Sequence, residues 1–566
     1  MNARKIKLNL AASFVILSSI SGFSTSAQTA SPPPQQPARG RLIVQPTPTP
    51  TPQQSPLPKQ SSAPAVVTAP VPKPPQTLVE LQANIRRVLQ NAALAKGQVG
   101  VKIAALETGK IVYEESADKY FMPASNMKGF TVAAALDRLT PDFRFVTSVY
   151  APAKPDAKGA LRGDVTIYGR GDPSIAASFN DGDYYKGINN LADKIAASGV
   201  RRIEGNLVGD ESYFSGASIG PTWEWDDLQW YYGAEISALT VNDNSVDLKI
   251  MPGAQINAPC LITLLPASSL FTIVNKTQTV AASEKRSIVV DKKLGSNILE
   301  ISGAMPVGDA GYSGAIAIEN PAEMFVFLLK NALQQKGIVI TGQTHVIDKK
   351  ARGEQLPGLS LAPKLPSQST QPTINQIEIA RLESAPLGLI AAKTLKPSQN
   401  LYTELILRAL GENSGDKSDS KKTSAERGLE VVQKFLAEAG VSNESVVQFD
   451  GSGLSRHDLI TPNAAVGLYS FMSKHRFGAT FQAALPIGGV DGTLKNRFQN
   501  SLAAGNVRAK TGTLDQVGTI SGYVTTASGE RLVFSILTNN LPDNNLRRQT
   551  MDEIVLLLAN FNGKIN

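Results

Sequence analysis

The most informative stretch of this sequence is Phe121-Met-Pro-Ala-Ser125-Asn-Met-Lys128-Gly-Phe-Thr-Val-Ala-Ala-Ala-Leu136. Pro123 and the apolar residues that follow it predict a helix that opens close to the proline. Ser125 and Lys128 are three residues apart, so on a helix they share one face, with an amine beside a hydroxyl. A serine at a helix start gains from the N-terminal amide groups, and burial can lower the pKa of a lysine until it acts as a base. The pair predicts a serine nucleophile that needs no histidine.

Two further motifs add weight to this pair, because Ser-x-x-Lys alone is a weak signal. Lys510-Thr-Gly-Thr513 precedes an apolar hairpin, which predicts that it lies on or near a strand. Its lysine can bind a carboxylate, and the small Gly512 lets a substrate backbone lie alongside the strand. Ser398-Gln-Asn400 supplies a hydroxyl and an amide directly before a helical run, 401–410. The three motifs in this order are the signature of penicillin-recognising serine enzymes.

The motifs lie in α/β surroundings. The spacing of apolar residues predicts helices over 77–95 and 550–561. Alternating patterns predict strand pairs, at 99–105 with 111–115 and at 519–525 with 531–538. Residues from about 150 to 380 are richer in Gly, Val, Ile and short alternating runs, which indicates inserted, mostly β material. The predicted fold class is therefore α/β (α+β).

The chain has 566 residues and a formal net charge of +8, most of which lies near the N-terminus. Residues 1–27 contribute +3 and residues 28–75 contribute +4, so the remainder carries +1. A basic start, an apolar run and small residues before Ala27 predict a cleaved secretory signal, with an uncleaved anchor as the alternative. Because the remainder is nearly neutral, we expect no nucleic-acid partner.

A proline-rich linker is predicted after the signal, since fifteen of the positions from 28 to 75 are proline. The chain is predicted to begin with a signal peptide at 1–27 and a disordered linker at 28–76. A catalytic domain follows in two parts, at 77–150 and 381–566. Inserted β-rich domains at 151–380 separate these parts, and a smaller one is nested among them at about 254–334. Three histidines and the single Cys260 leave little for a metal site, and we expect neither a metal nor another cofactor.

Further runs complete a family pattern. They are Pro123-Ala-Ser-Asn-Met-Lys128, Gly171-Asp-Pro-Ser174, Gly205-Asn-Leu-Val-Gly-Asp210, Tyr232-Gly-Ala-Glu-Ile-Ser-Ala-Leu239, Asn320-Pro321, Asn400-Leu-Tyr-Thr-Glu404, Asp450-Gly-Ser-Gly-Leu-Ser-Arg456, Leu485-Pro-Ile-Gly-Gly-Val-Asp-Gly-Thr493 and Ala509-Lys-Thr-Gly-Thr513. With them the chain resembles, from about residue 78 to 560, the serine DD-peptidases of peptidase family S13, the low-molecular-mass class C penicillin-binding proteins. The resemblance implies a transpeptidase/β-lactamase-like catalytic domain interrupted by two inserted, mostly β domains. It also implies cleavage of the terminal D-Ala-D-Ala bond of peptidoglycan stem peptides, often with endopeptidase activity on cross-links.

The resemblance also implies roles for the first two motifs. Ser125 would be the acylated nucleophile and Lys128 its general base. Ser398 would relay a proton towards the leaving group, and Asn400 would orient Lys128 and the substrate amide. The family usually has Asp in the middle of the second motif, where this chain has Gln399. That side chain need not touch substrate, so we expect the chemistry to survive with altered local hydrogen bonding.

The third motif receives its roles in the same way. Lys510 would polarise Ser398, and Thr511 and Thr513 would bind the terminal carboxylate of the substrate. The backbone N–H groups of Ser125 and Thr513 would form the oxyanion hole, where loss of one donor typically costs about 10²–10³ in rate.

A pocket for the stem-peptide side chain is a further hypothesis. The segment 223–232 resembles the inserted-domain loop that meets the stem peptide, so that Asp227 would hold an amine and Tyr232 would form an apolar wall. Asp515, where some relatives carry a polar amide, would favour the free amine of a diaminopimelate side chain. Arg456 would join this pocket. The alternatives are a surface acid, a packed ring and a structural salt bridge, respectively for Asp227, Tyr232 and Arg456.

Competing interpretations remain at this point. A β-lactamase or esterase on the same catalytic domain would need rapid deacylation, and a non-catalytic wall-binding scaffold would not need the intact motifs. Two other Ser-x-x-Lys runs, at 414–417 and 418–421, lie in a highly charged loop and are interpreted as solvated. The run from Gly453 to His457 imitates a nucleophile elbow without its final glycine, and Ser455 is assigned to turn chemistry.

The expected partners and location follow from the resemblance. The partners are peptidoglycan stem peptides and cross-links, with β-lactams as covalent inhibitors, and contact with a membrane only through an uncleaved signal segment. The expected location is exported and periplasmic, in the cell envelope.

Overall fold

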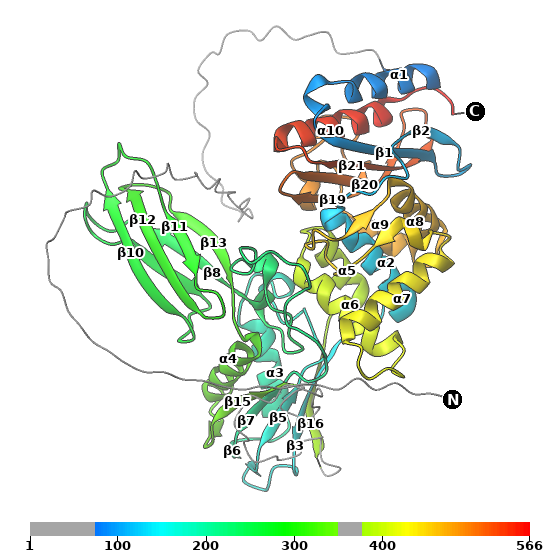
Figure 1. Ribbon diagram of the computed structural model, residues 1–566. Coiled ribbons are helices and arrows are strands. Elements are labelled where there is room, and N and C mark those ends of the chain that lie inside the picture. Colours follow the sequence, from blue (N-terminus) through cyan, green and yellow to red (C-terminus); the bar gives the residue numbers. More distant parts are fainter. Residues whose placement is uncertain (1–73, 349–375, 566) are drawn as a thin grey trace, which may run out of the picture. The chain divides into compact units, whose positions relative to one another are not determined.

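The computed structural model describes residues 74–348 and 376–565 (Figure 1). The predicted signal peptide and the predicted linker up to residue 73 lie outside these residues. Within the described part of the chain, no helix is both long and apolar enough to cross a membrane.

A five-stranded antiparallel sheet joins the two ends of the described chain. Its order is β19-β20-β21-β1-β2, formed by β1 (Gln98–Ala105), β2 (Ile111–Glu115), β19 (Arg508–Leu514), β20 (Val517–Thr525) and β21 (Arg531–Asn539). The predicted strand pairing and the predicted hairpin are confirmed. The register that pairs Val101 with Ile536 brings the N-terminal strands beside the C-terminal ones.

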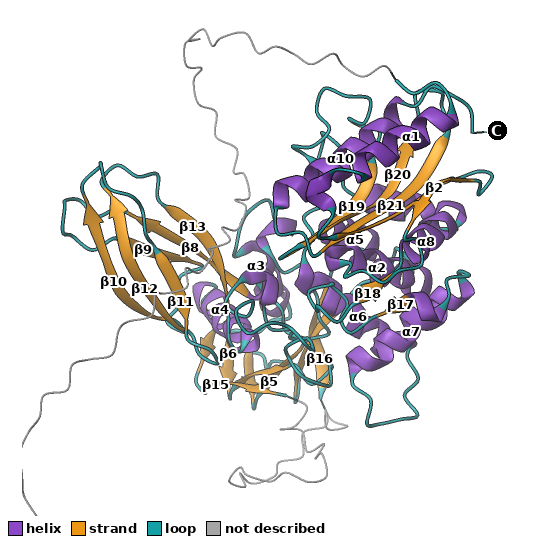
Figure 2. Cartoon of the chain, turned by 45° about the horizontal axis from the view of Figure 1, so that its top comes forward, coloured by secondary structure: helices purple, strands orange, loops and turns teal. Residues whose placement is uncertain are grey.

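Helices cover both faces of this sheet. On one face α1 (Leu78–Leu89) and α10 (Asn544–Asn560) lie together (Figure 2). The other face meets a group of helices that surround the first motif: α2 (Met127–Leu139), α5 (Leu387–Leu395), α6 (Asn400–Ser414), α7 (Ser424–Glu438), α8 (Pro462–Lys474) and α9 (Gly478–Ala484), with the two-stranded β17 (Val446–Val447) and β18 (Leu459–Ile460). Separate buried apolar clusters fill the two sides, so the third motif lies on a strand with a packed core behind it.

The predicted first helix is real but shorter than expected. Thr77 caps α1, because its side chain accepts from the Glu80 amide and the Glu80 carboxylate accepts from the Thr77 amide. The helix ends at Leu89 instead of Ala95, and a short turn follows in which the Asn91 side chain accepts from the backbone. At the other end of the chain, an Asp543 cap starts α10 at Asn544, before the predicted Thr550.

Residues between the motifs form a second set of sheets. One five-stranded sheet has the order β15-β7-β5-β3-β16, formed by β3 (Val146–Ala151), β5 (Val165–Tyr168), β7 (Leu207–Asp210), β15 (Thr344–Ile347) and β16 (Ile377–Glu383). A smaller sheet contains β4 (Ala160–Arg162), β6 (Arg202–Glu204) and β14 (Val339–Ile340). Two helices, α3 (Lys186–Ala197) and α4 (Pro321–Gln335), pack on these strands, so the stretch predicted as mostly β also carries long helices.

Two further three-stranded sheets lie within this stretch. They are β13-β8-β9 and β10-β12-β11, formed by β8 (Ser245–Met251), β9 (Leu261–Leu265), β10 (Thr272–Val280), β11 (Val289–Lys292), β12 (Ile298–Pro306) and β13 (Tyr312–Ala317). Five of these six strands lie inside the expected nested segment of about 254–334, and β8 precedes it. Helix α4, which also falls inside that segment, packs against β7 and β15.

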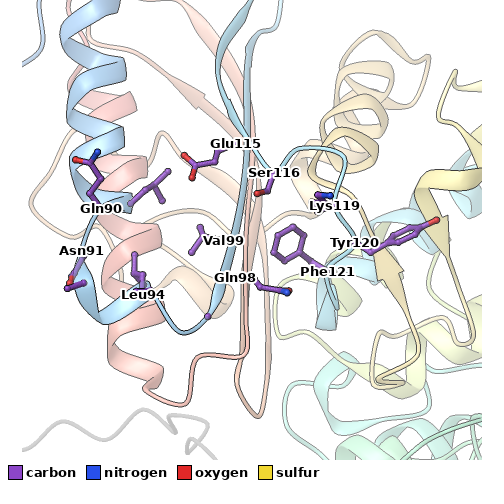
Figure 3. A pocket seen from close by; sticks show the side chains of 14 residues that line it. Gln90, Asn91, Leu94, Gln98, Val99, Glu115, Ser116, Lys119, Tyr120 and Phe121 are labelled. Atoms are coloured by element: carbon purple, nitrogen blue, oxygen red, sulfur yellow. The ribbon is translucent and has the colours of Figure 1, made fainter.

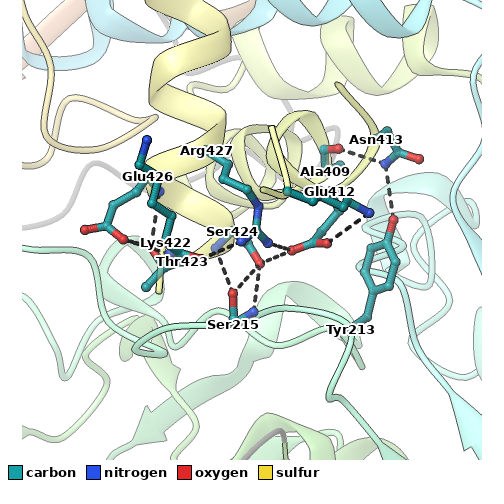
Figure 4. A network of polar contacts seen from close by, with 11 residues as sticks. Tyr213, Ser215, Ala409, Glu412, Asn413, Lys422, Thr423, Ser424, Glu426 and Arg427 are labelled. Carbon is teal, nitrogen blue, oxygen red and sulfur yellow. Dashed lines mark hydrogen bonds and ion pairs between the residues drawn. The ribbon is translucent and has the colours of Figure 1, made fainter. Parts of the chain in front are cut away.

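A polar network ties a loop of this stretch to the helices around the first motif (Figure 4). Ser215 and Ser424 exchange two hydrogen bonds, of 2.7 Å from the Ser215 amide and 3.0 Å from the Ser424 amide. Behind them Glu412 on α6 pairs with Arg427 on α7, both nearly buried. Ser424 Oγ also donates to Glu412, and Arg427 donates to the Lys422 carbonyl, so hydrogen bonds and an ion pair connect this loop to α6 and α7.

Candidate active site

Ser125 lies in a tight turn that leads into α2. The turn η2 (Ala124–Asn126) is a 3-10 helix and Ala124 has a left-handed backbone with φ of +47°. The Asn126 side chain donates to the Thr519 hydroxyl, which donates to the Pro123 carbonyl at 2.8 Å. Thr519 of strand β20 therefore holds the turn in place through these two hydrogen bonds. The α-helix itself starts at Met127, later than the sequence predicts.

Lys128 is completely buried and its amine has three acceptors. The Nζ atom lies 2.8 Å from Ser125 Oγ, 2.6 Å from Asn400 Oδ1 and 2.7 Å from the Ser452 carbonyl oxygen. Burial lowers the pKa of Lys128 to about 7, against the opposing charges of Asp450 and Glu404. Near neutral pH, much of the amine is therefore unprotonated and able to take the Ser125 proton.

Ser398 and Lys510 form a second hydroxyl–amine pair. Lys510 on β19 is completely buried and donates to Ser398 Oγ at 2.9 Å and to the Thr511 carbonyl at 2.7 Å. Burial, together with the charge of Lys128, holds the pKa of Lys510 well below its usual range. Ser398 sits between α5 and α6 with φ of +68°, a strained position for a residue with a side chain. Such strain is typical of functional turns.

Gln399 starts helix α6. Its side-chain oxygen accepts from the Leu401 amide at 3.0 Å, so it acts as the N-cap. The side chain also hydrogen bonds with the buried Asp243 carboxylate, whose pKa is raised by burial. Gln399 therefore caps α6 at the position where the family usually has Asp, and the next residue, Asn400, faces Lys128.

Strand β19 runs directly beside the nucleophile turn. A Cβ at Gly512 would come within 2.6 Å of the Pro123 carbonyl oxygen, 2.9 Å of the Ser125 amide nitrogen and 2.3 Å of Thr519 Oγ1. The sequence interpretation that Gly512 makes room for substrate needs correction, because the space its missing side chain leaves is filled by the enzyme itself. On the same strand, the Thr511 hydroxyl lies 2.7 Å from that of Thr493, and Thr513 is exposed.

Gly512→Ala is expected to lower the rate of acylation by about 10²–10³-fold, because the strand must move away from the backbone amide of the nucleophile. The measurement is the rate of covalent labelling by a penicillin. Gly467→Ala on α8 is the matched control: the nearest atom to a new Cβ there is Val441 Cγ2 at 3.4 Å, an ordinary contact. Equal labelling rates for the two variants would contradict the close approach of β19 and the turn.

The side-chain pocket residues of the sequence hypothesis gather around one loop. Arg456 pairs with Glu224 at 2.8 Å and donates to the Asp515 carbonyl at 3.2 Å. Burial, with the charges of Asp226 and Glu224, raises the pKa of Asp227 to about 7. Burial likewise raises the pKa of the Tyr232 phenol, and both Asp227 and Asp515 add to that effect. Arg456 thus forms the salt bridge of the alternative interpretation, and its charge also acts on Asp227.

Sequence reasoning gave no role to the acids behind Lys128. Asp450, Glu404 and Asp458 all act on the charge of Lys128 from within the core. Glu404 accepts from the Gly451 amide at 2.9 Å, and burial raises its pKa to about 8. Burial and the neighbouring Asp450 also raise the pKa of Asp458 well above its usual range. The sequence shows the Asp450-Gly-Ser-Gly run as a motif, but it does not reveal that the Ser452 carbonyl of this run accepts from Lys128, 324 residues away.

Two other features lie outside this constellation. Ser455 takes part in turn chemistry as predicted, since its amide donates to Asp450 at 2.8 Å and its hydroxyl accepts from the His457 amide.

A half-open cavity of about 710 Å³ lies between the end of α1, the start of β1 and the segment up to Phe121 (Figure 3). None of the predicted site residues lines it. In the described residues no cluster of His, Cys, Asp and Glu is arranged to hold a metal.

Comparison with known proteins places this geometry in a family. The model of the D-Ala-D-Ala carboxypeptidase 3 (S13) family matches residues 81–365 and 355–561. The chain is 30% identical over 497 residues to the D-alanyl-D-alanine carboxypeptidase of Actinomadura sp. (strain R39), covering 86% of each chain. It is 25% identical over 460 residues to D-alanyl-D-alanine carboxypeptidase DacB of Haemophilus influenzae, covering 80% of this chain and 87% of that protein.

A solved structure has the same fold. The crystal structure of penicillin binding protein 4 (dacB) from Haemophilus influenzae matches with a TM-score of 0.69 at 23% identity, covering 84% of this chain and 98% of that one. The predicted α/β fold class and the predicted family resemblance are confirmed. The chain belongs to the D-Ala-D-Ala carboxypeptidase 3 (S13) family of peptidases.

Proposed function

We propose that this protein cleaves the terminal D-Ala-D-Ala bond of peptidoglycan stem peptides through an acyl-enzyme on Ser125. The observation that carries the proposal is the 2.8 Å contact of Ser125 Oγ with the amine of a fully buried lysine whose pKa is lowered to about 7. A weakly acidic hydroxyl next to an unprotonated amine is the arrangement that activates a serine without histidine.

Acylation starts with proton transfer from Ser125 Oγ to the Lys128 amine. The oxygen then attacks the carbonyl carbon of the penultimate D-Ala, and the N–H groups of Ser125 and Thr513 stabilise the resulting oxyanion. Ser398 passes a proton to the nitrogen of the leaving D-Ala as the C–N bond breaks, and the proton held by Lys128 replaces it. Water then gives a proton to the unprotonated Lys128 amine and attacks the ester carbon, and Lys128 returns that proton to Ser125 Oγ as the shortened peptide leaves.

Substrate recognition uses both sides of the nucleophile. Lys510, Thr511 and Thr513 on β19 bind the terminal carboxylate. Asp227 binds the amine at the end of a diaminopimelate side chain, with the acidic Asp515, the Tyr232 ring and Arg456 around it. The carboxylate at the end of the same side chain binds Arg456. The present partner of Arg456, Glu224, is half exposed. The same pocket accepts a cross-linked peptide, which gives the enzyme endopeptidase activity.

The location and inhibitors complete the proposal. The basic and apolar N-terminal segment exports the protein, and a cell-wall substrate places it in the periplasm of the cell envelope. β-Lactams acylate Ser125 because their strained amide takes the place of the D-Ala-D-Ala bond. A solved structure of the Haemophilus influenzae relative is described as a complex with a novel β-lactam.

The purified protein, given a fluorescent penicillin and a stem pentapeptide, is expected to form a stable covalent adduct and to release D-Ala. The adduct is read on a denaturing gel and D-Ala release is followed by an amino-acid assay. Rapid turnover of the penicillin would instead support a β-lactamase. Absence of both labelling and D-Ala release would contradict the proposal and favour a wall-binding scaffold.

A further inference from the structure

A loop from the stretch between the motifs contacts the run 450–456, which connects β17 and β18. Three consecutive side chains of this loop each meet a residue of the run 450–456. Thr222 hydrogen bonds with Ser455, Trp223 Nε1 donates to Asp450 Oδ2 at 2.8 Å, and Glu224 pairs with Arg456 at 2.8 Å. Gly220 lies flat against the indole, since a Cβ there would come within 2.4 Å of the ring. The Trp223 side chain is therefore held in one orientation.

The run 450–456 in turn touches both members of the catalytic pair. Asp450 accepts from the amides of Ser452 and Gly453, at 3.0 and 2.6 Å, which shapes the run into a tight loop. The carbonyl of Ser452 accepts from the Lys128 amine. Gly453 has φ of +78° and a Cβ on it would lie 1.9 Å from the Ala124 carbonyl oxygen, so the run packs directly on the nucleophile turn.

The other end of the same loop reaches Lys128 by a second route. The backbone carbonyl of Tyr232 accepts from Asn400 Nδ2 at 2.8 Å, and Asn400 Oδ1 accepts from the Lys128 amine at 2.6 Å. Two of the three acceptors of the Lys128 amine are thus fixed by residues 222–232. The third acceptor is the nucleophile Ser125 itself.

We propose that the segment 222–232 positions the general base, with Trp223 as its principal side chain acting through Asp450 and the Ser452 carbonyl. The inference rests on the proposed function of Lys128. It gives two groups of this loop, the Trp223 side chain and the Tyr232 carbonyl, a positioning role beside the proposed binding residue Asp227. The Trp230 side chain packs on the apolar cluster of the insertion and has no such role. The charged groups that face Lys128 are Asp450, Glu404 and Asp458 from the acid cluster and Lys510 from β19.

Trp223→Phe keeps the ring volume and removes the N–H that Asp450 accepts. The acylation rate constant with penicillin is expected to fall by about 10- to 100-fold, because a small displacement of a catalytic group has effects of this size. The KM for a small D-Ala-D-Ala mimic, which lacks the side chain that reaches the loop, is expected to stay within about twofold. Trp230→Phe on the same loop is the control, since its ring packs against the apolar cluster of the insertion. Melting temperatures of both variants report on folding.

A double-mutant cycle separates positioning from general loosening. In the Asp450→Asn background, Trp223→Phe is expected to cause a smaller loss than in the wild-type background, because the indole N–H there donates to a neutral amide oxygen instead of a carboxylate. Asp450→Asn alone is expected to move the acid limb of the acylation rate to lower pH, because it removes a negative charge that raises the pKa of Lys128. Equal losses from Trp223→Phe and Trp230→Phe, or a full loss from Trp223→Phe in the Asp450→Asn background, would overturn the inference. Labelling and D-Ala release by the wild-type protein would still support the proposed function.

Discussion

Ser125→Ala is expected to abolish covalent labelling by penicillin and to lower D-Ala release by about 10⁴-fold or more, since no other hydroxyl can replace the nucleophile. The hydroxyl of Ser398 in the second motif is engaged, since it accepts from Lys510 at 2.9 Å. Mass spectrometry of the labelled wild-type protein, after proteolysis, is expected to locate the adduct on the peptide that contains Ser125.

The matched control for this variant is Ser418→Ala. Ser418 and Lys421 repeat the Ser-x-x-Lys spacing in an exposed loop, where the Ser418 amide donates to Asp416 at 2.8 Å. We expect full labelling of this variant. Persistent labelling of Ser125→Ala, with the adduct on another serine, would contradict the assignment of the nucleophile.

Lys128→Met is expected to lower the acylation rate by about 10²–10⁴-fold, the usual contribution of a positioned general base. Methionine has a similar length, so Ser125 keeps its place in the turn while the proton acceptor is lost. The wild-type rate is expected to rise with pH through about 7, because the unprotonated amine, which is the active form, becomes the major form above that pH. The residual rate of Lys128→Met is expected to be flat between about pH 6 and pH 8.

Stopped-flow measurement of acylation against pH tests both parts of this prediction. Lys421→Met, the lysine of the exposed Ser-x-x-Lys run, serves as control and is expected to retain the wild-type rate and pH profile. An acid limb near pH 7 that survives in Lys128→Met would assign the base to a different group.

Local sequence patterns were sufficient to predict the structural elements that depend on residues close together in the chain. The spacing of Ser125 and Lys128 predicts their contact because three residues make about one helical turn, and the hairpin that follows the third motif is marked by its own alternation. The family motifs were enough to predict the fold class, since each motif is a short run typical of one part of the catalytic domain.

Contacts between distant segments could not be derived from such patterns. Lys128 meets Asn400 and the Ser452 carbonyl through separations of hundreds of residues, and the acids around Asp450 tune its charge only because folding buries them together. The sequence interpretation placed a substrate backbone beside Gly512 for the same reason. The residue that needs to be small is evident in the sequence, but the backbone that packs against it belongs to the turn before α2, far away along the chain.

The sequence on its own therefore predicted the family, the order of the three motifs and the contact of Ser125 with Lys128, because all of these depend on short runs of residues. Tertiary structure alone decided how the pKa of the lysine amine is lowered and which loop holds the amine in place. Burial removes water from the amine, and the Trp223–Asp450 and Tyr232–Asn400 hydrogen bonds join segments that become neighbours only when the chain has folded.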